Sequence, residues 1–257
     1  MPAHDLALLT DAARAAGEIA LRFWKQTPKV WEKGADGPVT EADIAVNEML
    51  ADTLRGARPD YGWLSEETPD DPARLSADRV FIVDPIDGTR AFIAGEETFA
   101  HSLAVAEGGR VTAAAVYLPA LDRLYTACLT CPAMRDGAPI APSTRDQIDG
   151  ASVLLTQPAL GAELWPGGVP QVRRAFRASL AYRMCLVAEG RHDAMVTFRP
   201  TWEWDAAAGS LICARAGAVV TDRDGVPLAF NRPVPQVPGL IVAGAGMHAG
   251  LMARRHG

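Results

Sequence analysis

The sequence predicts an α/β fold in which helices cover mixed sheets. Short apolar runs such as 80–83 have the length and composition of buried strands. Apolar residues recur at helical spacing over 9–23 and 46–54, which indicates amphipathic helices. Alternating segments at 102–106 and 111–117 flank a Glu-Gly-Gly-Arg turn, a pattern typical of an antiparallel hairpin. We therefore expect antiparallel or mixed sheets rather than a purely parallel one.

In the first half of the chain, the opening helix ends before Thr27-Pro28. A second helix begins at Thr40, where Thr40-Glu41-Ala42-Asp43 resembles a capping box in its Asp-containing form. The hairpin follows, and then a strand over 123–127. The Pro- and Gly-rich stretch 132–142 is the best candidate for a divide between layers. We expect residues 1–140 to form an α+β layer and residues 141–257 an α/β layer, together making one compact unit.

In the second half, short strands and helices alternate. Helix 206–216 is expected to have Asp205 as its N-cap and to end at Gly217. The predicted strands are 152–156, 194–198, 218–221 and 240–243, and the predicted helices are 180–189, 206–216 and 247–254.

Composition bounds the class of protein. The 257 residues carry a formal charge of −6 and a pI near 5.4, which argues against nonspecific binding to nucleic acid polymers or anionic membranes. The amino terminus has no basic start or unbroken apolar core, and no stretch approaches 18 apolar residues, so we expect a cytoplasmic protein. The chain has four cysteines, two of which form a C-x-x-C pair. We expect all four to be reduced structural thiols rather than a zinc or redox site.

The most informative segment runs from Val80 to Gly95. Its apolar run ends in Asp84-Pro85-Ile86-Asp87-Gly88-Thr89, which places two acids at the carboxyl end of a strand. The amide groups of Gly88, Thr89 and Arg90 would then open a helix and attract an anion. Asp-Pro and Asp-Gly also mark ordinary turns. Carboxylates that gather divalent cations beside phosphate-holding amides predict a metal-dependent phosphoryl-transfer site.

Two further segments make the pattern specific. Trp63-Leu64-Ser65-Glu66-Glu67 precedes the central motif, and Trp204-Asp205-Ala206-Ala207-Ala208-Gly209 follows far downstream. Together the three segments resemble the inositol monophosphatase superfamily of Mg²⁺-dependent, lithium-sensitive phosphatases. The resemblance implies a layered α-β-α-β-α sandwich of the inositol monophosphatase and fructose-1,6-bisphosphatase type. It also implies a phosphomonoesterase that uses metal-activated water.

The same resemblance implies a metal site with two or three Mg²⁺ ions. Glu66 and Asp84, with the carbonyl of Ile86, would bind the first ion. Asp84, Asp87 and Asp205 would bind the second, so that Asp84 bridges both. A third, weaker ion would lie near Glu66. Glu67 is the less certain member of the Glu pair, because the first Glu occupies the family's usual ligand position.

Thr89 and Asp43 form the catalytic pair that the resemblance implies, beside Glu66. A Thr hydroxyl bonded to an Asp can orient water for in-line attack on phosphorus. Asp43 taken alone is more typical of a helix-cap residue, and the two roles are compatible. Gly88, Thr89 and Arg90 are the expected substrate-binding residues, although a solvated helix-start Arg is as common.

Substrate choice depends on weaker similarities. Phe198 stands seven positions before Asp205, where inositol-cleaving members carry an acid that contacts sugar hydroxyls. We expect Phe198 to offer instead an apolar wall that can accept a purine face. The approach from Arg199 to Asp205 and the segment from Ser179 to Gly190 resemble CysQ-type 3′(2′),5′-bisphosphate nucleotidases. We therefore expect adenosine 3′,5′-bisphosphate as the substrate.

Alternatives remain open. Inositol 1-phosphate is one, and Asp87-Gly88-Thr89-Arg90-Ala91-Phe92-Ile93 also resembles the histidinol-phosphatase branch. A noncatalytic regulatory protein is the minority alternative. The sequence leaves open whether Arg90, Arg199 or the cluster of Arg173, Arg174 and Arg177 meets the substrate. It also leaves open the oligomeric state of the protein, and a homodimer is one of the open alternatives.

Overall fold

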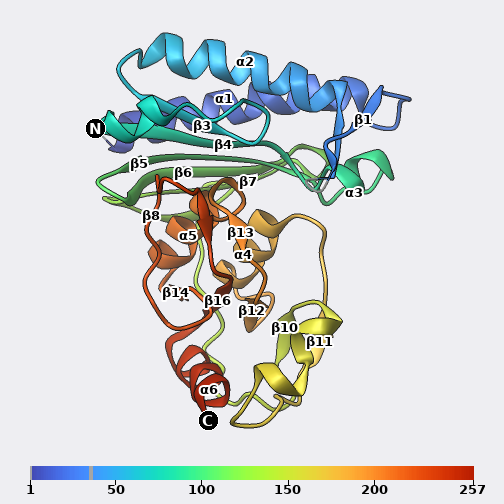
Figure 1. Ribbon diagram of the computed structural model, residues 1–257, viewed down its shortest axis with the longest axis vertical. Coiled ribbons are helices and arrows are strands. Elements are labelled where there is room, and N and C mark those ends of the chain that lie inside the picture. The colour runs from blue at the N-terminus through green and yellow to red at the C-terminus, as the bar shows by residue number, and fades with distance from the viewer. Residues whose placement is uncertain (1, 35–36) are drawn as a thin grey trace.

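The computed structural model describes residues 2–34 and 37–257. Helices and sheets stack in five layers along the long axis of the molecule (Figure 1). The first layer holds α1 (Pro2–Phe23) and α2 (Glu41–Ala57), and the central layer holds α4 (Leu180–Ala188) and α5 (Glu203–Ala216). A sheet lies on each side of the central helices, and α6 (Ala245–His256) forms the last layer. The predicted α-β-α-β-α sandwich is confirmed.

The first sheet has seven strands in the order β3-β4-β5-β6-β7-β8-β9. β3 pairs with β4 in parallel, and every later pair is antiparallel, so the sheet is mixed as predicted. Its strands are β3 (Gly62–Ser65), β4 (Arg79–Asp87), β5 (Ala100–Glu107), β6 (Arg110–Leu118), β7 (Arg123–Cys128), β8 (Cys131–Arg135) and β9 (Ala138–Pro139).

The second sheet is also mixed, with the order β11-β10-β12-β16-β14. β10 is parallel to both of its neighbours, whereas β16 is antiparallel to β12 and β14. Its strands are β10 (Ser152–Leu154), β11 (Arg173–Ala175), β12 (Ala194–Thr197), β14 (Val219–Thr221) and β16 (Leu240–Ala243). Two small antiparallel pairs are β1 (Val30–Glu32) with β2 (Pro38–Thr40), and β13 (Thr201–Trp202) with β15 (Gln236–Val237). Short 3₁₀ turns are η2 (Pro72–Ser76), η3 (Pro119–Leu121), η4 (Gln157–Leu160) and η5 (Ala162–Leu164).

Both faces of the first sheet are buried, which explains the unbroken apolar run at the centre of β4. Phe81 and Val83 pack with α1 and α2, whereas Val80 and Ile82 pack with α4 and α5. Alternate residues of a strand point to opposite faces, so a strand covered on both sides must be apolar throughout. A third core cluster lies under α6.

Two expectations about α5 and the cysteines need correction. α5 begins at Glu203 with Trp202 as N-cap, so Asp205 lies inside the first turn and is not the cap. The helix ends at Gly217 in the left-handed conformation, as predicted. Cys128 and Cys131 form a disulfide, because the β7–β8 hairpin places them directly opposite each other. The prediction of reduced thiols was therefore wrong for this pair.

Cys185 and Cys213 are buried free thiols, as expected. Within the described residues, no helix has the length and apolarity needed to cross a bilayer.

Candidate active site

The turn from β4 into α3 (Thr89–Ile93) brings the central motif to one edge of the first sheet. β4 continues to Asp87 through an irregularity between Asp84 and Asp87, so the strand is longer than its apolar run. Gly88 caps α3 with φ 98° and ψ 38°. A Cβ there would lie 3.2 Å from the carbonyl oxygen of Thr98. The turn therefore needs glycine at this position for its conformation and for space.

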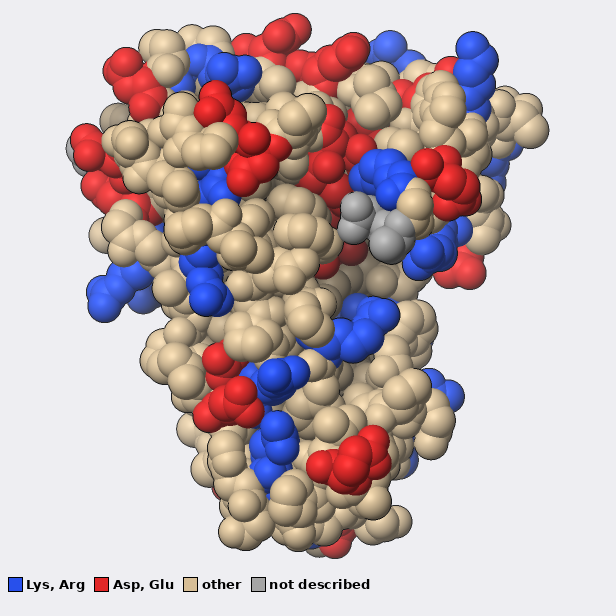
Figure 2. All heavy atoms as spheres, in the orientation of Figure 1, with Lys and Arg blue, Asp and Glu red and all other residues tan. Residues whose placement is uncertain are grey.

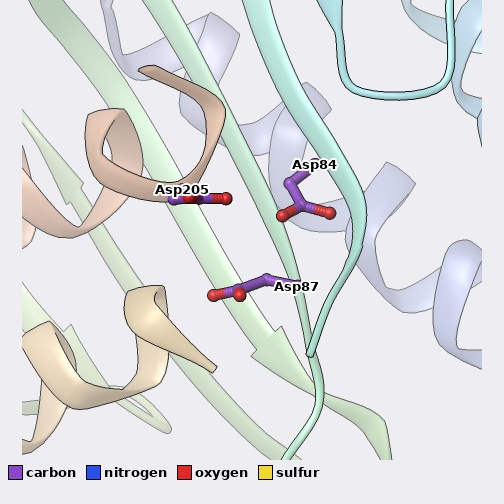
Figure 3. A group of neighbouring side chains, drawn as sticks. All are labelled: Asp84, Asp87 and Asp205. Atoms are coloured by element: carbon purple, nitrogen blue, oxygen red, sulfur yellow. The ribbon is translucent and has the colours of Figure 1, made fainter. Parts of the chain in front are cut away.

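Asp84, Asp87 and Asp205 come together from β4 and α5 (Figure 3). One ligand atom from each carboxylate lies within 4.8 Å of the others. The Ser102 hydroxyl on β5 donates to the Trp204 carbonyl at 2.8 Å, which ties the start of α5 to the sheet. This contact places Asp205 opposite the end of β4. The three acids predicted as ligands of the second ion are thus assembled.

Glu66 reaches the same edge because β3 runs parallel to β4. Ser65 pairs with Val83, and the Glu66 amide donates to the Val83 carbonyl at 3.2 Å. The carboxyl ends of parallel strands lie at one edge of a sheet, so Glu66 follows β3 where Asp84 follows the core of β4. Glu66 is not a member of the three-carboxylate group among the described residues. Its charge nevertheless raises the pKa of Asp84, after burial, which is the largest cause.

Crowded carboxylates without cations are unfavourable, and the pKa values of this site show it. Burial, followed by repulsion from neighbouring acids, raises the pKa of Asp84 and Asp205 well above the ordinary range. Burial raises the pKa of Glu66 to about 7, despite the attraction of Lys33. Asp84 Oδ1 is buried and has no hydrogen-bond partner among the described residues. An orphaned carboxylate oxygen beside other acids fits a site built to hold divalent cations.

Asp43 and Thr89 meet as predicted. The Thr89 hydroxyl lies 3.1 Å from Asp43 Oδ1 and 3.1 Å from the Ile86 carbonyl oxygen. A hydroxyl carries one proton, so these two hydrogen bonds are alternatives. Asp43 Oδ2 accepts from the Thr40 amide at 2.8 Å and from its hydroxyl at 2.5 Å, completing the capping box. The two carboxylate oxygens of Asp43 thus serve the helix cap and Thr89 separately.

Burial raises the pKa of Asp43 to about 6, although hydrogen bonds from Thr40 and Thr89 oppose the shift. The Ile86 carbonyl keeps a second lone pair beyond the Thr89 contact, so its predicted role as a ligand is compatible with this geometry.

Several site residues were not singled out as functional from the sequence. Asp87 Oδ2 accepts from the Ser179 hydroxyl at 2.6 Å and from the Ala181 amide at 2.7 Å, which docks the start of α4 on the motif. Arg183, one turn along α4, is buried and attracted to both Asp87 and Asp205. The sequence predicted the helix at 180–189 and showed the resemblance of the segment from Ser179 to Gly190, but it assigned no role to Ser179 or Arg183 individually.

His101 also supports the motif, because its Nδ1 contacts the Pro85 carbonyl oxygen. Burial lowers the pKa of His101 to about 4, so it is neutral at physiological pH.

Lys33, which directly follows β1, pairs with Glu66 and Glu67. In Figure 2 acidic side chains line a hollow at the centre of the visible face, and basic side chains flank it.

The arginines named from the sequence differ in position. Arg90 is exposed and lies beside Gly37. Arg199 is exposed and close enough to Arg183 for the two charges to repel. Arg173 lies on β11, at the edge of the second sheet, where its Nε donates to the Gly150 carbonyl at 3.0 Å. Arg174 is on the same edge strand, and Arg177 donates to the adjacent Phe176 carbonyl.

Phe198 does not line the site. Its ring packs edge-on against Trp165, 5.3 Å between centroids, in the core cluster under α6. The expectation that Phe198 offers an apolar wall to the substrate is therefore wrong. Its position in the sequence only shows that an acid is missing there.

Comparison with known proteins agrees with this site. The profile of the inositol monophosphatase family matches residues 2–256. A 3′-phosphoadenosine 5′-phosphate phosphatase of Mycobacterium leprae is 34% identical, with 94% of this chain and 89% of the relative covered. The 3′(2′),5′-bisphosphate nucleotidase CysQ of Escherichia coli is 33% identical, with 85% and 91% covered.

Among solved structures, the extragenic suppressor protein suhB of Bartonella henselae superposes with a TM-score of 0.83 at 27% identity. The superposition covers 99% of each chain. The family profile spans nearly the whole chain. Three of the acids in the motifs that resemble the family, Asp84, Asp87 and Asp205, also lie close together in the structure. This chain belongs to the inositol monophosphatase family and is a metal-dependent phosphoric monoester hydrolase.

Proposed function

We propose that the protein is an Mg²⁺-dependent 3′(2′),5′-bisphosphate nucleotidase that converts adenosine 3′,5′-bisphosphate to AMP and phosphate. Glu66, Asp84 and the Ile86 carbonyl would hold one ion, and Asp84, Asp87 and Asp205 a second. Such ions supply Lewis-acid stabilisation of the charge that develops on the attacking and leaving oxygens. A third, weaker ion near Glu66 is part of the proposal.

Charge balance supports two divalent ions. Among the described residues, six carboxylates interact within the site, and the two basic side chains paired with or attracted to them are Lys33 and Arg183. The formal deficit of four positive charges equals the charge of two divalent cations. The six acids are Asp43, Glu66, Glu67, Asp84, Asp87 and Asp205.

Thr89 and Asp43 would move the proton in the hydrolytic step. Water attacks phosphorus, its oxygen forms the new P–O bond, and the ester P–O bond breaks. The water proton passes to Thr89 Oγ1 as the Thr89 proton passes to Asp43 Oδ1, along the 3.1 Å contact. With its pKa near 6, Asp43 is mostly ionised at neutral pH and can accept that proton. The departing alkoxide takes a proton from solvent. The amides of Gly88 and Thr89 would hold the phosphate.

One observation carries the choice of a bisphosphate. Arg183 is a buried guanidinium, 7% exposed, that is attracted to Asp87 and Asp205 and lies near Arg199. Two guanidinium groups beside the carboxylates suit a second phosphate, which they can bind with charge-assisted hydrogen bonds. Inositol 1-phosphate and histidinol phosphate carry no second phosphate. Arg90, which is exposed and follows Thr89 in α3, is a further candidate for contact with the substrate.

Phe176 replaces Phe198 as the proposed apolar wall. Phe176 is 46% exposed, and the Arg183 guanidinium carbon lies 5.3 Å from its ring centroid. An exposed aromatic ring held against a substrate-binding cation offers a surface for a nucleobase.

The test is a phosphate-release assay with Mg²⁺ on adenosine 3′,5′-bisphosphate, inositol 1-phosphate and histidinol phosphate. We expect kcat/KM to favour the bisphosphate by roughly tenfold to a hundredfold. Arg183→Met should lose most of that preference, whereas Arg174→Met, on the edge strand of the second sheet, should keep it. Equal efficiency of the wild-type protein on either monophosphate would reject the nucleotidase and leave the phosphatase mechanism in place.

A further inference from the structure

Lys33 forms an ion pair with two adjacent carboxylates at the site. Its Nζ lies 2.7 Å from Glu67 Oε1 and 3.1 Å from Glu66 Oε1. The main chain supports this position, because the Lys33 amide donates to the Gly37 carbonyl at 2.8 Å and so joins the two arms of the β1–β2 hairpin. One ammonium therefore bridges a predicted metal ligand, Glu66, and its neighbour, Glu67.

The two contacts of Lys33 differ in kind. The Glu67 side chain is 3% exposed and makes the shorter contact, whereas the Glu66 side chain is 21% exposed and makes the longer one. Glu67 thus holds the ammonium whether or not Glu66 contributes. The contact with Glu66 can be exchanged for another cation without releasing Lys33 from the site.

The two carboxylates share a single ammonium. Lys33 Nζ lies within hydrogen-bond distance of both Glu66 and Glu67, so one positive charge faces two formal negative charges. A divalent cation at Glu66 would supply the missing positive charge.

We infer that Lys33 is an internal counter-ion that occupies Glu66 in the metal-free enzyme and is displaced onto Glu67 alone when a divalent cation binds Glu66. The inference rests on the proposed metal site. Because the cation must displace the ammonium, Lys33 weakens metal binding at Glu66. It also stabilises the empty site by offsetting the repulsion between Glu66 and Glu67.

The inference is tested by metal binding without substrate, with Mn²⁺ as the probe and the free ion measured by electron paramagnetic resonance. Lys33→Met removes the competing charge, so we expect Mn²⁺ to bind about tenfold more tightly, the effect of one close, partly screened charge. Lys33→Gln serves as a second neutral variant should Lys33→Met fail to fold. Damage to the site would weaken binding, so a gain in affinity separates displacement from a structural role.

Two controls complete the experiment. Lys33→Arg keeps the charge and should bind Mn²⁺ within about threefold of the wild type. Lys29 precedes β1 and is exposed, so Lys29→Met tests the loss of a nearby positive charge that does not contact the site. This variant should bind Mn²⁺ within about twofold of the wild-type affinity. If the wild-type protein binds Mn²⁺ and both neutral Lys33 variants bind it equally or more weakly, the counter-ion role of Lys33 is refuted and the proposed metal site stands. If the wild-type protein binds no Mn²⁺, the metal site is refuted with it.

Discussion

At the scale of single residues, the carboxylate oxygens of the site differ in their protein contacts. Asp43 uses Oδ2 for the helix cap and Oδ1 for Thr89. Asp87 uses Oδ2 for Ser179 and Ala181 on α4. Asp84 Oδ1 has no protein partner among the described residues. Hydrogen bonds thus orient Asp43 and Asp87, while Asp84 keeps an oxygen that a cation can bind.

The pair of Thr89 and Asp43 should behave as one catalytic unit. Thr89→Ala and Asp43→Ala each remove one end of the proposed proton path, so each should lower kcat roughly 10²- to 10⁴-fold. The double variant should lose little more, because the joint function is lost only once. Steady-state kinetics at saturating Mg²⁺ measures all three effects.

Thr40→Ala separates catalysis from capping. It removes the Thr40 hydroxyl that bonds Asp43 Oδ2 and leaves the Thr89 contact in place. We expect it to lower the free energy of unfolding by about 1 kcal/mol and kcat by only a few-fold. Independent, additive losses in the Thr89 and Asp43 variants would contradict the paired role.

At the scale of elements, the long helices and the central strands were predictable because their patterns are strong. The apolar run of β4, the hairpin of β5 and β6, and the capping box of α2 each combine periodicity with a turn or cap signal. The predicted strand at 240–243 matches β16 at both ends. Strands of two or three residues, such as β1, β11 and β13, contain too few positions to show a period.

The residues missed at the site share one physical reason. Lys33, Arg183 and Ser179 are brought to the candidate site by contacts with segments far along the chain, which local patterns do not encode. The acids were found because their motifs are local and specific. Phe198 shows the reverse error, since its position suggested a substrate wall and its side chain lies in a core.

The turn between β4 and α3 offers a test at this scale. Gly88→Ala places a side chain at φ 98° and 3.2 Å from the Thr98 carbonyl oxygen, so both strain and a backbone contact oppose it. We expect a loss of about 1–3 kcal/mol in the free energy of unfolding and a large loss of kcat, because Thr89 follows directly. Urea unfolding and kinetics measure the two losses.

Gly137→Ala is the matched control for Gly88→Ala. Gly137 has φ 79°, and an added Cβ would meet no atom within 4 Å. It should cost only the conformational strain, about 1 kcal/mol, and leave kcat unchanged. Equal effects of the two variants would show that the close approach to Thr98 is unimportant.

At the scale of the whole molecule, the acids at the site make metal-free stability depend on pH. The folded-state pKa values of Asp43 and Glu66, about 6 and about 7, exceed their ordinary values of 3.8 and 4.5. Between these limits the folded state binds more protons than the unfolded state. The contribution of these two acids to stability therefore falls as pH rises from about 4 to about 7, and it should level off above that window. His101 contributes in the opposite sense, because burial lowers its folded-state pKa to about 4.

Urea unfolding at pH 5 and pH 8 in the presence of a chelator measures this effect. We expect the contribution of these acids to drop by about 2–4 kcal/mol at the higher pH. Saturating Mg²⁺ should remove this contribution, because bound cations favour the charged carboxylates. Asp84→Asn should reduce it, since one source of repulsion is gone. A pH dependence of stability that is the same with and without saturating Mg²⁺ would contradict the proposed cation site.

The central layer has a consequence for biosynthesis. α4 and α5 cover one face of the first sheet, yet they follow most of the chain, and Asp205 follows with them. During translation the first sheet can form while that apolar face and its aspartates stay uncovered. A nascent chain halted before α5 would thus expose a large hydrophobic surface without a complete metal site, and we expect such chains to aggregate or recruit chaperones.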